Sequence, residues 1–262
     1  MKTFITSINK KLYDIYGKKF IETWKINAKS DIKLIICFEG EIPDEIMHLS
    51  NDKIIILNIS SIKQISFLKK FGKFSEARGI RFSQNPLDKK ILKYSYNYRF
   101  DAIRFSFKIF SFIKCLEMNL INSDFAWIDA DMVCLKEFDS NSLKSIFPEG
   151  NQLASYLGRK YFPQPNPYSE CGFIGYNYNH KNCIDFINDI FNIYENGDLF
   201  LLNEWHDCMV FDHIRSKYES LNVEFKNLSI NLPQADHPFM QTELATYFDH
   251  LKGPERKKVG HS

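Results

Sequence analysis

The stretch "FAWIDADMVCLKEF" (residues 125–138) places two aspartates directly after an apolar run. The run is typical of a strand buried in a core, and only Ala130 separates Asp129 from Asp131. Side chains at i and i+2 of a strand point the same way, so we expect the two carboxylates to converge. Left unpaired there, they would repel each other and lose hydration. A divalent cation, Mn²⁺ or Mg²⁺, removes this cost, because it accepts carboxylate oxygens and leaves positions for phosphate oxygens and water.

An ordinary turn is the alternative explanation for the two aspartates, since aspartate is common where strands end. The D-x-D pattern alone therefore has little specificity. Its flanks, FAWI before and MVCLKEF after, place it at the end of a buried strand and favour the metal site.

Other apolar runs of strand length precede this segment, and segments with helical spacing separate them. The expected strands are residues 2–8, 31–40, 52–59 and 123–135, and the expected helices are residues 10–26, 61–74 and 98–119. Strands that alternate with helices predict an α/β fold with a mainly parallel central sheet flanked by helices. In such sheets ligands bind beyond the carboxyl ends of the strands, where the aspartates are expected.

The remaining segments are less regular. Residues 75–90 are expected to form a polar loop and residues 161–170 a proline-rich aromatic loop. A short strand is expected at residues 171–177, followed by helices at 180–197 and 203–218 and a basic, loop-like tail at 249–262. No repeat or low-complexity linker divides the chain, so we expect a single domain over residues 1–262.

Composition narrows the class of protein. The 262 residues are 44% hydrophobic and 25% charged, and the net charge of +2 lacks the basic footprint of nucleic-acid binders. The six cysteines form no CxxC pair, which indicates reduced thiols in a cytoplasmic protein. The N-terminus turns polar too early for a signal peptide, and no apolar run of membrane-spanning length is present. The basic tail is a candidate for weak peripheral contact with an anionic membrane.

The segment "WIDADMVCLKEFD" resembles the DxD segment of GT-A-fold glycosyltransferases, most closely the family-8 type related to bacterial galactosyltransferases and glycogenin. Further segments resemble this family in the same order. "RFDAIRFSFKIF" resembles its arginine-bearing helix, and "SECGFIGYN" resembles its Asn-Ala-Gly strand with Glu170 and Cys171 in place of Asn and Ala. "NEWHDCMVFDHI" resembles its later helix, and "HLKGPERK" resembles its H-x-x-G-x-x-K tail with Arg256 in the lysine position.

The resemblance implies a Rossmann-like GT-A domain in which residues 1–138 bind a nucleotide-sugar and residues 139–262 bind the acceptor. It implies that Asp129, Asp131 and His250 hold Mn²⁺, which binds the diphosphate. It further implies transfer of a hexose, favouring a UDP-linked donor, to a hydroxyl of a glycan or lipid-linked acceptor with retention of configuration. The replacements at Glu170 and Arg256 leave the exact family and the sugar open.

The resemblance also assigns the other candidate residues. Asp207 and Glu170 are the catalytic candidates, which orient the sugar or, in an inverting enzyme, supply the general base. The candidates for binding the donor, besides Asp129, are Thr6, Ser7, Asn9, Tyr13, Arg104, Lys108, Gly253, Arg256 and Lys257. Candidates for contacting the sugar or acceptor are Tyr161, Phe162, Tyr168, Trp205 and His206.

Several of these residues have simpler explanations. Arg104 and Lys108 lie four apart on one helix face and can reach one anion, but Arg104 can also pair with Asp101. Tyr13 can be ordinary helix packing, and Asp207 can be a solvated helix residue.

Two other functions fit the same stretch. "FAWIDADMV" also resembles the motif of haloacid-dehalogenase-type phosphatases, with Asp129 as nucleophile and Asp131 as acid/base. That motif usually opens the chain, and "GDLFLLNE" lacks the second aspartate of the later G-D-x-x-x-D motif. A non-catalytic nucleotide-sugar-binding module is the third hypothesis, and the retained charges at Asp129, Asp131 and His250 argue against it.

Overall fold

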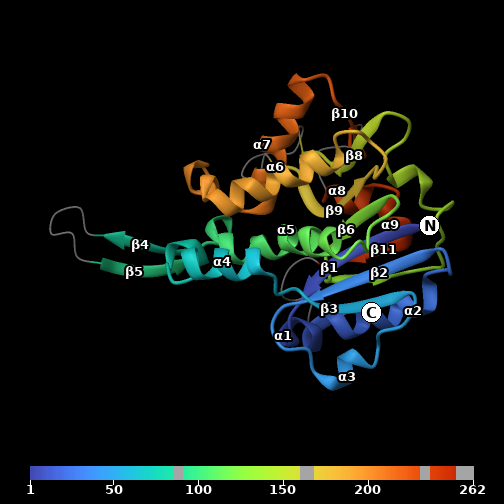
Figure 1. Cartoon of the computed structure of the whole chain (residues 1–262), viewed down its shortest axis with the longest axis horizontal. Helices are drawn as coiled ribbons and strands as arrows, with labels where there is room; N and C mark the ends of the chain where they lie inside the picture. The colour runs from blue at the N-terminus through green and yellow to red at the C-terminus, as the bar shows by residue number, and fades with distance from the viewer. Residues whose placement is uncertain (85–90, 160–167, 231–236, 252–262) are drawn as a thin grey trace.

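The computed structural model describes residues 1–84, 91–159, 168–230 and 237–251. Its centre is a seven-stranded sheet in the order β10-β8-β9-β6-β1-β2-β3 (Figure 1). The strands are β1 (Lys2–Ile8), β2 (Ile32–Phe38), β3 (Ile54–Asn58), β6 (Phe125–Ile128), β8 (Gln152–Leu157), β9 (Glu170–Tyr176) and β10 (Glu224–Asn227). Neighbours run parallel except at β9, which is antiparallel to both β6 and β8. The predicted mainly parallel α/β sheet is confirmed.

The strands of the first half are apolar on both faces because helices cover both sides of the sheet. On β1, Phe4 packs into one core and its neighbour Ile5 into the other. The helices are α1 (Lys10–Leu12), α2 (Lys18–Asn27), α3 (Asp44–Met47), α4 (Ile62–Phe71), α5 (Ala102–Glu117), α6 (Cys183–Asn196), α7 (Asp207–Ser220), α8 (Pro238–Gln241) and α9 (Leu244–Tyr247). Helices α1–α3 lie on one side of the sheet and α4–α7 on the other (Figure 1).

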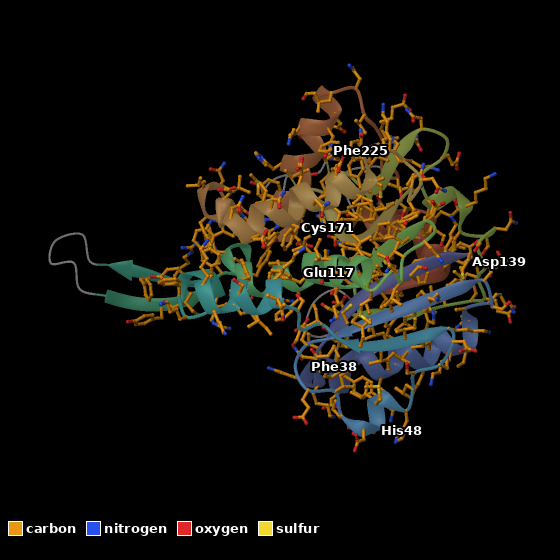
Figure 2. The ribbon with its side chains drawn as sticks, in the orientation of Figure 1. Phe38, His48, Glu117, Asp139, Cys171 and Phe225 are labelled. Atoms are coloured by element: carbon orange, nitrogen blue, oxygen red, sulfur yellow. The ribbon has the colours of Figure 1, made fainter. Side chains whose placement is uncertain are left out.

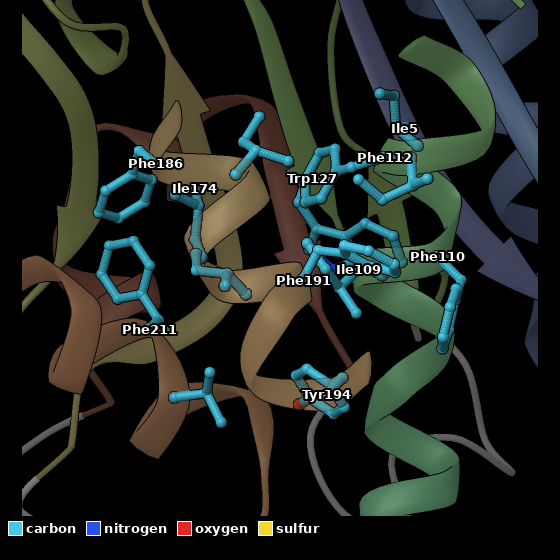
Figure 3. Close-up of a cluster of buried hydrophobic side chains, with 14 of the residues drawn as sticks. Ile5, Ile109, Phe110, Phe112, Trp127, Ile174, Phe186, Phe191, Tyr194 and Phe211 are labelled. Atoms are coloured by element: carbon cyan, nitrogen blue, oxygen red, sulfur yellow. The ribbon is translucent and has the colours of Figure 1, made fainter. Parts of the chain in front are cut away.

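Helix α5 is the central element of the second side. Asp101 caps its N-terminus by accepting the backbone N–H of Arg104 at 3.0 Å. Its apolar face contributes Ile109, Phe110 and Phe112 to a core that also contains side chains of α6 and α7 (Figure 3). The helix is thereby fixed beneath the ends of β6 and β9.

Two small antiparallel pairs complete the structure. The pair of β7 (Met132–Cys134) with β11 (Phe248–His250) joins the segment after the two aspartates to the beginning of the expected tail. The pair of β4 (Ile80–Gln84) with β5 (Ile91–Tyr96) forms a hairpin that projects from the body (Figure 1).

The hairpin corrects the expected polar loop at residues 75–90. Gly79 has a φ of +76°, which turns the chain into β4, and the described side chains then alternate along the strand. The segment appeared polar because the hairpin is not buried in the core. The tail is also corrected, since Phe248–His250 forms a strand. The helices found in the described residues include none that is both long and apolar enough to cross a bilayer.

Candidate functional site

A cleft of about 1270 Å³ opens at the carboxyl ends of β1, β2 and β6. Its walls come from both halves of the sequence. One side is lined by Ser7, Asn9, Tyr16 and Glu39, the floor by Lys108, Asp129, Asp131, Glu170 and Asp207, and the rim by Tyr96, Tyr98 and Arg104. The expected position of the ligand site at this edge of the sheet therefore coincides with a large cleft.

Asp129 and Asp131 line the floor of this cleft, and the buried side chain of His250 meets them from behind it. His250 Nε2 lies 3.1 Å from Asp131 Oδ1 and 3.8 Å from Asp129 Oδ2. One ligand atom from each of the three residues lies within 4.8 Å of the others. The prediction that the two aspartates lie on one face of a strand was wrong. Strand β6 ends at Ile128, and Asp129 and Asp131 converge because the chain bends after it.

The pairing of β7 with β11 explains why His250 reaches the aspartates. The His250–Met132 register places the imidazole beside the turn, and the N–H of Leu251 donates to the carbonyl of Asp131 at 2.9 Å. Gly172 leaves the space for the ring, because a Cβ there would lie 2.7 Å from His250 Cε1. A side chain at position 172 would therefore displace the imidazole.

The donor atoms of this cluster fit a hard divalent cation. Carboxylate oxygens and an imidazole nitrogen are suitable ligands for Mn²⁺. The imidazole is fully buried, and its Nδ1 has no hydrogen-bond partner among the described residues. Two acidic side chains and a buried imidazole thus bring their ligand atoms close together, as a bound cation requires.

Lys108 is the cation on the other side of Asp129. It extends from α5 and forms an ion pair with Asp207, lies 3.8 Å from Asp129 Oδ1, and donates to the carbonyl of Cys171 at 2.6 Å. Cys171 is labelled near the centre of the molecule in Figure 2. Burial opposes the charge of Lys108, but the two carboxylates outweigh it and raise its pKa. Burial likewise opposes ionisation of Asp207, and the Lys108 ammonium outweighs it and lowers the carboxyl pKa.

Glu170 lies beside this group at the start of β9. It forms an ion pair with Arg159, approaches His237 Nε2 at 3.0 Å, and accepts the N–H of Gly172 at 3.2 Å. The expected catalytic candidates, Glu170 and Asp207, therefore both lie on the cleft floor with a basic partner. Neither Arg159 nor His237 was expected from the sequence.

The opposite wall contains some of the residues expected to bind the nucleotide. Ser7 and Asn9 line it and donate to the two oxygens of Glu39 at 2.9 and 3.1 Å. Burial raises the Glu39 pKa, although these hydrogen bonds oppose the shift. Thr6 and Tyr13 are buried and do not line the cleft. Tyr13 packs in the core, and Tyr16 lines the cleft in its place.

Arg104 and Lys108 do not meet at a common position. Arg104 lies at the cleft rim, where its Nη1 is 3.5 Å from the Tyr96 hydroxyl. Asp101 does not use its carboxylate to pair with the guanidinium, as the simpler explanation assumed, but caps α5 and accepts the Tyr96 hydroxyl at 2.9 Å. Although Arg104 and Lys108 are four residues apart on α5, Arg104 therefore lies at the rim of the cleft and Lys108 on its floor.

The remaining candidates differ in their surroundings. His206 lines the cleft and caps α7, whereas Trp205 packs against Phe100 and Phe200. Tyr168 packs its ring against His206 at 5.2 Å. The candidates Tyr161, Phe162, Gly253, Arg256 and Lys257 lie outside the described residues.

One of the residues missed had a recognisable signal. Glu39 directly follows the apolar strand β2, in the same relation that Asp129 has to β6. The rule that polar groups at carboxyl ends of parallel strands face the ligand would have found it. Arg159 and His237 had no such signal, because they flank segments without a periodic pattern.

Comparisons with known proteins bear on the fold. No family model matches the sequence, and no curated protein does. The similar solved structures include mouse xyloside xylosyltransferase 1, with 10% identity over 87% of this chain and 86% of that one and a TM-score of 0.47. They also include a glycosyltransferase involved in glycosylation of the major capsid of PBCV-1, with 11% identity over 98% of each chain and a TM-score of 0.49. A third is the bifunctional glycosyltransferase WbbM, with 10% identity over 96% of this chain and 46% of that one and a TM-score of 0.52.

Of these three, WbbM alone has a TM-score above 0.5, and the inference rests on it. This chain spans about half of WbbM, 46% of its length. At 10% identity the likeness concerns the fold and not the reaction. The chain therefore shares with part of WbbM an α/β fold, which here is a mainly parallel sheet between helices with a cleft at the carboxyl ends of its strands.

Proposed function

We propose that this protein is a metal-dependent glycosyltransferase that moves a hexose from a nucleotide diphosphate sugar, most simply a UDP-hexose, to a hydroxyl of a glycan or lipid-linked acceptor. The observation that carries the proposal is that one ligand atom each of Asp129, Asp131 and His250 lies within 4.8 Å of the others, at a point where the two aspartates line a large cleft. Asp131 and His250 are 119 residues apart in sequence, and a separate strand pair brings them together.

The cluster would hold Mn²⁺, which as a Lewis acid stabilises the charge that develops on a leaving diphosphate. The wall of Ser7, Asn9, Tyr16 and Glu39 would receive the base and ribose. Glu39 accepts hydrogen bonds, as ribose hydroxyls require, and its own partners hold its carboxylate in place.

Asp207 and Glu170 would orient the transferred sugar. Each carboxylate is fixed by a basic partner, Lys108 or Arg159, and can accept hydrogen bonds from sugar hydroxyls. The lowered pKa of Asp207 makes it a weak general base at neutral pH. The proposal includes retention of configuration, in which neither carboxylate has to remove the acceptor proton.

The test is a screen of UDP-, GDP- and dTDP-sugars for Mn²⁺-dependent hydrolysis and transfer. We expect turnover of one donor class with Mn²⁺ and its loss with EDTA. The anomeric configuration of the product, read by NMR, then distinguishes retention from inversion.

His250→Ala tests the metal site independently of turnover. We expect Mn²⁺ affinity, measured by EPR of the free ion, to fall at least roughly tenfold. His48→Ala, at an exposed position directly after α3, is the matched control and should leave affinity unchanged. Unchanged affinity in His250→Ala would remove His250 from the site. Hydrolysis of p-nitrophenyl phosphate without turnover of any nucleotide-sugar would favour the phosphatase hypothesis, and tight UDP binding without any turnover would favour a binding module.

A further inference from the structure

A row of exposed tyrosines runs from the projecting hairpin into the cleft. Tyr94, Tyr96 and Tyr98, here called the tyrosine row, are 62%, 53% and 44% exposed. Tyr96 and Tyr98 line the cleft, whereas Tyr94 lies further out along β5. Tyr94 and Tyr96 are two positions apart on one strand, so their rings share a face with a spacing of roughly 7 Å.

The hairpin is attached to the body through the face opposite Tyr94 and Tyr96. Arg81 pairs with Ser95 across the two strands and points to the opposite face, where its guanidinium stacks 3.6 Å over the Phe100 ring. The Trp205 ring lies 4.4 Å from the same guanidinium. The anchored face therefore packs against the body, whereas the rings of Tyr94 and Tyr96 on the other face stay 62% and 53% exposed.

The inner end of the row is fixed to the cleft. The Tyr96 hydroxyl donates to Asp101 at 2.9 Å and lies 3.5 Å from Arg104 Nη1. At the outer end, the Tyr94 ring rests edge-on against Phe82 with centroids 4.9 Å apart. Both rings are therefore held in place before any ligand binds, which lowers the entropy lost on binding.

We propose that the tyrosine row binds an extended oligosaccharide acceptor, whose end enters the cleft while its preceding sugars stack on Tyr96 and Tyr94. This inference rests on the proposed glycosyltransferase function. A pyranose ring presents C–H groups on its face and hydroxyls around its edge. An aromatic face attracts such C–H groups through its negative quadrupole, and the phenol hydroxyl can reach the sugar's edge.

Other occupants fit the row less well. Among the described side chains of the hairpin, the exposed large apolar ones are tyrosines, not the aliphatic groups that enter a bilayer. Three half-exposed rings offer a few hundred Å², roughly, against about 800 Å² for each partner of a stable protein interface. The row is narrow, open and continuous with the cleft, as a subsite for a linear chain of sugars would be.

The experiment measures binding and turnover separately. Malto-, cello-, galacto- and chito-oligosaccharides, from disaccharide to hexasaccharide, are titrated by saturation-transfer NMR without any donor. In at least one series we expect the dissociation constant to fall roughly three- to tenfold with length. Tyr94→Ala should abolish this gain, and Tyr94→Phe, which keeps the ring, should retain it.

The controls identify which proposal fails. Leu201→Ala removes a side chain that is 85% exposed elsewhere and should not alter length dependence. Donor hydrolysis without acceptor should be equal in Tyr94→Ala and the wild type, since Tyr94 does not line the cleft. Absence of donor turnover in the wild type would overturn the proposed function and leave the binding result standing.

The tyrosine-row inference itself would be overturned by any of three results. These are an absence of length-dependent binding in every series, a length gain that persists in Tyr94→Ala, and a loss of binding to phosphatidylglycerol vesicles in Tyr94→Ala. The last result would assign the row to a membrane.

Discussion

The aromatic core under the sheet and the floor of the cleft lie next to each other but are stabilised in different ways. In the core, Trp24 packs edge-on against Phe4 and Phe138 with ring centroids 5.1 and 5.2 Å apart. On the floor, Lys108 lies between the carboxylates of Asp207 and Asp129. The core needs only apolar side chains of suitable volume, whereas each charge on the floor needs one particular partner.

The two regions are joined through β11. Phe248 is buried in the aromatic core with its ring centroid 5.0 Å from that of Phe138, and His250 follows it two residues later, buried behind the floor and beside Asp131. The core thus positions a residue that contacts the floor. The comparison indicates that stability resides mainly in the core and specificity of the site in the floor, and mutations can separate the two.

The largest effect should come from the core. Trp24→Ala removes a ring that is 1% exposed, and we expect the free energy of unfolding to fall by roughly 3–5 kcal/mol. Urea denaturation measures this. Trp24→Phe should cost less, because it keeps a ring and removes an indole N–H without a hydrogen-bond partner. A loss well below this range in Trp24→Ala would contradict the view that stability resides mainly in the aromatic core.

On the floor, removing one charge of the Lys108–Asp207 pair should lower the free energy of unfolding more than removing both charges. Lys108 and Asp207 are each 12% exposed, and Lys108→Met leaves the carboxylate buried without its partner. We expect a loss of roughly 3 kcal/mol, at the lower end for a buried pair because the cleft admits water. The double variant Lys108→Met with Asp207→Leu should recover most of this stability. A double variant as unstable as the sum of the single ones would show that the pair itself stabilises the fold.

The acid dependence of stability should identify the same pair. The pKa of Asp207 is lowered in the folded protein, so its contribution is present above the ordinary value of 3.8 and lost as pH falls through the folded value. Asp207→Asn should cost roughly 2 kcal/mol at neutral pH, and the difference from the wild type should shrink below pH 3.8. Thermal unfolding across this range measures it. A constant difference down to the lowest pH would contradict the ion pair.

The smallest effect is expected at His206. Burial lowers its pKa, but Cys208, Asp207 and Glu204 outweigh burial and raise it to about 9. Its contribution should be complete below the ordinary value of 6.5 and be lost as pH rises through about 9. His206→Asn keeps a side chain that can cap α7 and should cost about 1 kcal/mol at low pH and nothing at high pH. A pH-independent cost would indicate that His206 acts through packing alone.

The sequence predicted much of the fold because burial leaves a local record. The apolar runs at β1, β2, β3 and β6 identified strands buried on both faces, and the spacing of residues 98–119 identified α5. The two aspartates were located because they interrupt such a run. The hairpin β4–β5 was missed for the same reason, since strands outside the core carry no continuous apolar pattern.

The sequence by itself determined the order of β1, β2, β3, β6 and β9 and of the helices α2, α4, α5, α6 and α7 between and after them, and it placed Asp129 and Asp131 at the mouth of the sheet. Through resemblance it also singled out His250 and Asp207 as site candidates. Only the tertiary structure decided which charges meet. Lys108 and Asp207 are 99 residues apart, and Glu170 and His237 are 67 apart. Hydrophobic periodicity records whether a residue is buried, whereas an ion pair depends on where two chain segments lie after folding. The identity of a charge's partner is therefore a property of the folded chain and not of its local sequence.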